Sequence, residues 1–246
     1  MNAVDSIQIN LNSKFATTYI NGSSCNCSFD LPSVQIPNEH HIHVSVINAI
    51  IPYSFYNINL SNNMLIYIVG GVSYTLNIVI GNYNAIQLAN YLTANMNGFN
   101  VSYSSIPNTY TFTHTSQNFT LVSISSLLKT IGFYNKDNVS NNFKLSSSFC
   151  ANLQSIQCIH IKSNFMTGNI NSSDIYVQDT LCTIPVNSAP NSNIVYQNTD
   201  KFTTNLYSSI LNDIVIKIVN QDNALLDLNG LDWSITLQLD IVDFVN

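Results

Sequence analysis

LDWSITLQLDIVDF, residues 231–244, alternates apolar and polar side chains along most of its length. One set of alternate positions is entirely apolar and consists of Leu231, Trp233, Ile235, Leu237, Leu239 and Ile241. The other set is polar and consists of Asp232, Ser234, Thr236, Gln238 and Asp240. A period of two is typical of a β-strand with one buried and one wet face. The segment therefore predicts a long strand in a sheet that covers a hydrophobic core.

Most of the remaining chain also has the pattern of strands. Extended, alternating segments lie at residues 5–12, 27–31, 40–53, 155–163, 180–186 and 213–220. The Asn229-Gly230 dipeptide is a strong turn signal, so we expect the strand at 213–220 to be a near neighbour of the terminal strand. The Asn- and Ser-rich stretches at 135–148 and 187–200 are predicted to be loops.

Residues 61–135 have a different pattern, which begins with a hairpin on Gly70-Gly71. Pairing outward from Val69 and Val72 places Tyr67 opposite Tyr74 and Leu65 opposite Leu76, which makes one face apolar. A second hairpin is predicted across residues 106–108, between strands at 99–105 and 109–115. A further strand at 119–125 leads into a short helical turn at 125–133.

An amphipathic helix is predicted between the two hairpins. Asn84 is the expected N-cap, Gln87 completes a capping box, and Tyr83 with Leu88 forms a hydrophobic staple. The apolar stripe of the helix is Ala85, Leu88, Ala89, Leu92 and Met96, and Gly98 ends it. We therefore predict a mainly β protein in which one discontinuous sandwich, residues 1–60 and 136–246, carries a small α+β insertion at 61–135.

The composition bears on the class of partner. Only 8% of the residues are charged, against about 25% in an average soluble domain, and the net charge is -6. The seven basic residues are all Lys, so the sequence argues against nucleic acid as a partner. The given sequence has no basic, apolar start, so we expect no secretory leader, and the lack of an apolar run of about 20 residues predicts no membrane-spanning segment. Scarcity of charge is expected where large contact surfaces become buried.

The best candidate for a metal site is NEHHIH, residues 38–43. Alternation places Glu39, His41 and His43 on one face of a strand, with His40 on the other, and neutral imidazoles are good metal ligands. The alternative is a polar strand end whose histidines face water or a subunit contact. Because a fourth ligand is not evident, the sequence assigns no metal or cofactor.

Common catalytic signatures are absent: the sequence contains no GxSxG, HExxH, GxxxxGK[ST] or GxGxxG. The five Cys residues, Cys25, Cys27, Cys150, Cys158 and Cys182, favour free buried thiols over a disulfide framework. Cys150 or Cys158 could act as a nucleophile with His160, but a buried Cys is more often a small apolar side chain. Asp240 and Asp243 fall on opposite faces of the terminal strand and do not form an acid/base pair. We therefore expect no enzyme.

The order of elements resembles a known family. IPYSFYNIN, the Gly-Gly hairpin, IGNYNAIQLANYL, the second hairpin, LLKTIGF and LDLNGLDWSITLQLDIV are similar to the penton (minor capsid) proteins of virophages and polinton-like viruses. Those of Mavirus-type virophages are the most alike, and the resemblance covers Ile51 to Ile241. It implies a single jelly-roll β-sandwich with an inserted unit.

The same resemblance implies a function. Five copies would close the icosahedral vertex of a virion beside a double-jelly-roll major capsid protein, with assembly in the host-cell cytoplasm. The insertion would sit at the outer end of the sandwich, where it could cap the vertex or hold a fibre. An alternative function is a head that binds a host receptor or glycan. One departure is that the chain has no basic arm of the kind that faces a packaged genome.

Overall fold

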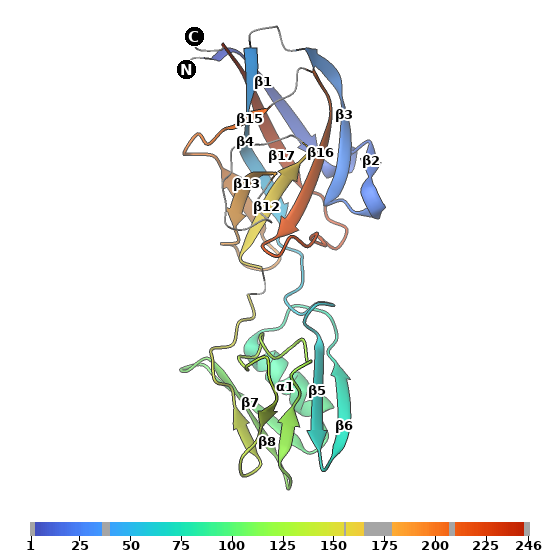
Figure 1. Cartoon of the computed structure of the whole chain (residues 1–246), viewed down its shortest axis with the longest axis vertical. Helices are drawn as coiled ribbons and strands as arrows, with labels where there is room; N and C mark the ends of the chain where they lie inside the picture. Colours follow the sequence, from blue (N-terminus) through green and yellow to red (C-terminus); the bar gives the residue numbers. More distant parts are fainter. Residues whose placement is uncertain (1–2, 36–39, 155, 165–178, 207–209, 244–246) are drawn as a thin grey trace. The chain divides into compact units, whose positions relative to one another are not determined.

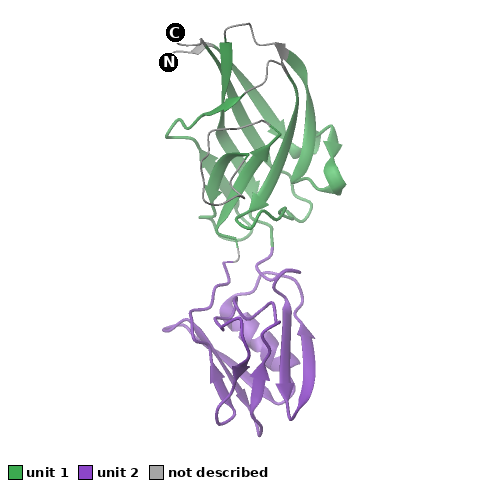
Figure 2. Ribbon diagram, viewed as in Figure 1, with its two compact units in different colours: residues 1–55, 156–246 green, residues 56–155 purple. Residues whose placement is uncertain are grey.

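The computed structural model describes residues 3–35, 40–154, 156–164, 179–206 and 210–243. The chain folds into two compact units (Figure 2). The first unit comprises residues 1–55 and 156–246, and the second comprises residues 56–155. The second unit is therefore longer at both ends than the insertion predicted at 61–135.

The first unit is a sandwich of two antiparallel sheets (Figure 1). The first sheet has the order β1 (Ala3–Asn12), β17 (Ser234–Asp243), β4 (His40–Pro52) and β14 (Asn193–Gln197), and β15 (Thr204–Leu206) also pairs with β4. The second sheet has the order β13 (Thr180–Pro185), β12 (Cys158–Ser163), β16 (Ile210–Asn220), β3 (Asn26–Gln35) and β2 (Thr18–Tyr19). Two short 3-10 turns, η1 (Ser13–Phe15) and η2 (Ile20–Gly22), flank β2.

The strand order is that of a jelly roll. When β14 and β15 are taken together and the short β2 is set aside, eight strands remain in chain order among the described residues of this unit. The first sheet then contains the first, eighth, third and sixth of them, and the second sheet contains the fifth, fourth, seventh and second. Such interleaving is the product of two Greek keys in one double-sheet barrel. The second unit is inserted between β4 and β12, the third and fourth strands, which confirms the predicted fold class.

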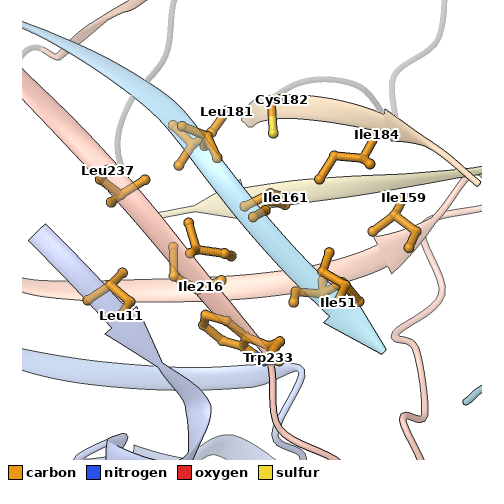
Figure 3. Close-up of a cluster of buried hydrophobic side chains, with 14 of the residues drawn as sticks. Leu11, Ile51, Ile159, Ile161, Leu181, Cys182, Ile184, Ile216, Trp233 and Leu237 are labelled. Atoms are coloured by element: carbon orange, nitrogen blue, oxygen red, sulfur yellow. The ribbon is translucent and has the colours of Figure 1, made fainter. Parts of the chain in front are cut away.

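The core of the sandwich follows the predicted alternation. Trp233, Ile235, Leu237, Leu239 and Ile241 are all buried, and β17 lies between β1 and β4 with its polar positions on the outer face. Figure 3 shows side chains from both sheets meeting in this core, including Leu11, Ile51, Ile161 and Ile216. Leu231 departs from the prediction, because it precedes the strand and is 50% exposed.

The turn predicted at Asn229-Gly230 is present, since both residues have positive φ angles, of 51° and 79°. It does not join paired strands, however. β16 lies in the second sheet and β17 in the first, so the two strands that the sequence predicts to be near neighbours are not paired with each other. The chain between them crosses from one sheet to the other, which a turn signal in the sequence cannot distinguish from a hairpin.

The second unit contains two antiparallel sheets and a helix around a separate core. One sheet has the order β10 (Asn138–Val139), β9 (Phe119–Leu121), β5 (Met64–Val69) and β6 (Val72–Asn77). The other has the order β11 (Lys144–Ser146), β8 (Thr109–His114) and β7 (Phe99–Ser104). The helix α1 (Ala85–Asn95) adds Leu88, Ala89 and Leu92 to the core.

Local predictions for this unit are confirmed in detail. Tyr67 pairs with Tyr74, and Val69 pairs with Val72. The Asn84 side chain accepts from the Gln87 backbone N–H at 2.8 Å, and the Gln87 side chain accepts from the Asn84 N–H at 2.9 Å, which completes the capping box. The apolar face of the first hairpin is only half covered, because β6 is an edge strand and its Tyr74 is exposed.

Two stretches predicted as loops contain strands. Residues 135–148 include β10, which pairs with β9, and β11, which pairs with β8. These pairings hold the stretch in the second unit, which is why that unit continues to residue 155. Residues 187–200 include β14, which pairs with β4. The predicted helical turn at 125–133 is a run of turns with one helical bond, from the Ile131 N–H to the Leu127 carbonyl.

In the described part of the chain, α1 has 11 residues, and no helix there is long and apolar enough to cross a membrane.

Candidate functional site

Two histidines of NEHHIH, His41 and His43, lie on the outer face of the first sheet. His41 and His43 point to the same side of β4, with their Nε2 atoms 3.2 Å apart and their ring centroids 5.0 Å apart. Across the strand pair, His43 is directly opposite Asp240, whose carboxylate accepts hydrogen bonds from the Ser6 hydroxyl and the Gln238 amide. The result is a polar row that crosses β1, β17 and β4.

The ligand set suggested for a metal is not assembled among the described residues. Glu39 lies outside them, and His40 is opposite Asp243 in the strand register. Within the described ranges, no three His, Cys, Asp or Glu side chains are grouped so that they could hold a metal ion. The pair His41 and His43 supplies two imidazoles, and a closed site requires four ligands.

Acidification is expected to destabilise the first unit through His43. Burial, followed by the neighbouring His41, lowers the pKa of His43 from its ordinary value of 6.5, whereas Asp240 acts in the opposite direction. The unfolded chain then binds a proton at a higher pH than the folded one, so stability falls as the pH drops below about 6.5. Thermal melts between neutral and mildly acidic pH measure this loss.

Two variants with opposite effects test the assignment. His43→Gln should reduce the loss of stability at acidic pH. Asp240→Asn should increase that loss, because the favourable negative charge beside the imidazolium disappears. An unchanged pH dependence in His43→Gln would exclude this histidine as the source.

The five cysteines are free, as the sequence predicts, but they are not all buried. Cys25, Cys27 and Cys182 are buried in the sandwich core, Cys158 is half-buried, and Cys150 is exposed in the second unit. Burial raises the pKa of Cys25 to about 12 and that of Cys27 to about 11. Cys27 lies on β3 and Cys25 directly precedes that strand; both thiols stay protonated in the core, so they act as small apolar side chains.

Cys158 and His160 meet on the outer face of the second sheet. The Cys158 Sγ lies 3.8 Å from the His160 Nε2, and the His160 Nδ1 lies 2.9 Å from the Thr183 hydroxyl. The arrangement has the order of a nucleophile, a base and an orienting group. Burial, followed by the charge of Asp222, raises the pKa of Cys158, which is the reverse of what an activated cysteine needs. The contact of Thr183 with His160 could not be predicted from the sequence, because it depends on the pairing of β12 with β13.

Alkylation rates distinguish the two interpretations of Cys158. With iodoacetamide, we expect Cys150 to react first, Cys158 more slowly, and the three core thiols only as the sandwich unfolds. Intact mass and peptide mass spectrometry over a time course measure the order. A Cys158 that reacted faster than Cys150, and lost this advantage in His160→Gln, would instead indicate an activated nucleophile.

Exposed apolar side chains are common on both units. In the sandwich, Ile50 and Val195 are cross-strand partners on the outer face of the first sheet, and both are exposed. The second unit exposes more of them, including Leu60, Val72, Val79, Ile86, Ile106, Ile124 and Val139. Apolar side chains surrounded by neutral polar ones, with few charges, are typical of surfaces that take part in protein contacts.

Comparisons with known proteins bear on the fold. The chain matches no protein-family model and no curated protein sequence. Among solved structures, it is similar to the crystal structure of the selenomethionine-labelled mavirus penton protein, with a TM-score of 0.52 and 11% sequence identity. The match covers 97% of this chain and 100% of the penton chain. At this identity the likeness is one of architecture: the chain has a penton-like fold over nearly its whole length.

Proposed function

We propose that this chain is a structural capsid protein that forms the pentameric vertex of an icosahedral virus particle. The observation that carries the proposal is the coverage of the structural match, which includes both units and not the jelly roll alone. Jelly rolls serve many functions, so a sandwich by itself would support little. A match that also covers the inserted unit of this chain is more specific.

The surface chemistry supports assembly. A head-to-tail contact whose rotation closes after five copies makes a ring, and each copy buries the same two surfaces. Because few ionised side chains are present, such contacts bury apolar and neutral polar groups with little cost of desolvating charge. The neighbours in the particle would be a double-jelly-roll major capsid protein, and assembly would take place in the host-cell cytoplasm.

The mass of the assembled protein tests this function. Native mass spectrometry and light scattering should give five copies, either for the protein alone or after mixing with the major capsid protein. Electron micrographs of the assembly should show fivefold symmetry. A trimer, or a monomer that never enters particles, would contradict the proposal.

A second candidate function is attachment to a host receptor, a glycan or a fibre through residues 56–155. It is favoured by the apolar side chains that this unit exposes, among which Ile106 is 97% exposed and Leu60 is 83% exposed. The two functions are compatible, since the jelly roll would assemble and the inserted unit would bind. Particles assembled from protein that lacks residues 56–155 should then form normally and fail to attach.

A further inference from the structure

The edge strand β6 of the second unit has no strand on its outer side among the described residues (Figure 1). Its six residues, VSYTLN, include no charged residue, Pro or Gly, and their register with β5 has no bulge. Open edges offer unpaired backbone groups to other chains, so proteins normally shorten, charge or cover them. β6 has none of these protections, which makes its outer edge a candidate binding surface.

The other three edges of the two sheets in this unit are protected. β10 and β11 are only two and three residues long. β7 has six residues, but the Thr93 hydroxyl of α1 accepts from the Val101 N–H at 2.9 Å and lies 3.1 Å from the Val101 carbonyl oxygen. On the same edge, the Phe99 N–H donates to the Met96 carbonyl at 3.1 Å. The lack of protection is therefore specific to β6.

The hairpin turn fixes which backbone groups of β6 face outward. Gly70 and Gly71 have φ angles of 58° and 81°, as in a type I′ turn, so the flanking pair Val69 and Val72 exchanges hydrogen bonds. Hydrogen-bonded and non-hydrogen-bonded pairs alternate along antiparallel strands. From Val72 onward, every second residue of β6 therefore bonds β5, and the residues between them point away from it.

The outward residues are Ser73, Thr75 and Asn77. The bonds on the far side of β5 agree with this assignment, since the Ile66 carbonyl accepts from the Val122 N–H next to β9. In β5 the even-numbered positions thus face β9, and the odd-numbered positions face β6. The outward residues of β6 present their N–H and C=O groups at the spacing that a further antiparallel strand requires.

The inner side chains of β6 extend beyond the core of the second unit. Tyr74 is paired with the buried Tyr67, and their rings stack with centroids 5.3 Å apart. Tyr74 is nevertheless 45% exposed, and Val72, on the same face, is 53% exposed. A strand added beside β6 would cover both side chains, and the burial of their apolar surface would stabilise the contact.

The sequence of β6 itself matches the strand that its edge requires. Such a strand has apolar residues at alternate positions, which cover Val72 and Tyr74, and it is uncharged, because β6 offers no charged partner. The apolar set of β6 is Val72, Tyr74 and Leu76, and the polar set is Ser73, Thr75 and Asn77. The edge is therefore complementary to a second copy of itself, as an isologous contact requires.

We propose that β6 pairs with β6 of a second copy of this chain, antiparallel across a two-fold axis, with Thr75 opposite Thr75. In this register Ser73 lies opposite Asn77 of the other copy, so the outward residues form hydrogen-bonded pairs. Each Tyr74 then lies opposite Leu76, and the apolar faces of the two sheets become continuous. A two-fold contact cannot close a fivefold ring, so it joins copies from separate assemblies and does not depend on the pentameric vertex.

Sedimentation velocity of the full-length protein at increasing concentrations tests the contact. A strand pair of this length is a small interface, so association should be weak and should grow with concentration. We expect the mass to rise from a base value to at least twice that value. The base value reports the ring separately: a base of one copy would contradict the vertex, while doubling from that base would still support the β6 contact.

Thr75→Pro should block the pairing and leave the hairpin intact. The N–H that it removes faces outward, where Pro is tolerated in an edge strand. Because both copies lose this donor, two hydrogen bonds at the axis disappear, and the dissociation constant of the pair should rise about tenfold or more. The cooperative melt of the second unit should remain, which shows that the variant is folded.

Charges at position 75 test the register. Thr75→Lys and Thr75→Asp should each weaken self-association about fivefold or more, because like charges then meet at the axis. An equimolar mixture of these two variants should restore association, because opposite charges then meet. Ser102→Lys is the matched control, since it places the same charge on an exposed residue of the protected strand β7, and it should leave association unchanged.

Three results would overturn the proposal. A wild-type mass that stays at its base value up to the solubility limit would show that β6 does not pair with itself. Equal association of the wild type and Thr75→Pro would place the contact elsewhere. If the mixed charge variants associated no more strongly than either variant alone, the register with Thr75 at the axis would be excluded.

Discussion

Trp233→Ala is expected to lower the free energy of unfolding of the first unit by about 3–5 kcal/mol. Trp233 is buried in the sandwich core, its indole Nε1 donates to the Ser24 carbonyl at 2.7 Å, and its ring lies edge-on to Phe29 at 5.9 Å. Truncation leaves a cavity and an unsatisfied acceptor at the point where β17 begins. Calorimetry and circular dichroism measure the loss, and the transition of the second unit serves as an internal reference.

Leu231 provides the matched control for this prediction. It occupies the same set of alternate positions in the sequence, yet it is 50% exposed. Leu231→Ala should therefore change the stability by no more than about 0.5 kcal/mol. Comparable losses at both positions would mean that the apolar face continues through Leu231 and that the strand begins earlier than Ser234.

The position of the unit boundaries predicts a sharp difference between two deletions. Replacing residues 56–155 with a short Gly/Ser linker should leave a soluble, cooperatively folded jelly roll, because both cores are self-contained. Deleting only residues 61–135 should give insoluble protein. This deletion removes most of the core against which Ile58, Leu145 and Leu153 pack. It also leaves β10 and β11 without their pairing partners, β9 and β8.

The two removed segments, expressed alone, test the same unit boundaries. Residues 56–155 alone should fold with a cooperative melt, whereas residues 61–135 alone should not, because they lack Ile58 and the two closing strands. Expression yield, circular dichroism and thermal melts distinguish the outcomes. If the shorter deletion were soluble and the longer one aggregated, the boundary at residues 55 and 155 would be wrong.

The candidate sites depended on features that strand alternation alone could not supply. Alternation correctly placed His41 with His43, because side-chain direction in a strand repeats every two residues. It did not bring Thr183 to His160, and it did not pair His43 with Asp240. Those groups come from separate strands, so they exist only once the strands are paired.

The sequence by itself determined much of the local structure: the long strands, the register of the Gly70-Gly71 hairpin, and the capping box at Asn84. These depend on residues within a few positions of one another, where sterics and hydrogen bonds leave few options. Only the tertiary structure decided which strands share a sheet, where the second unit ends, and that Leu231 is exposed. A jelly roll joins residues as distant as Ser13 and Asp232, 219 positions apart. Packing of the whole core selects such pairs, because the closure entropy of so long a loop is offset only when both sheets are complete.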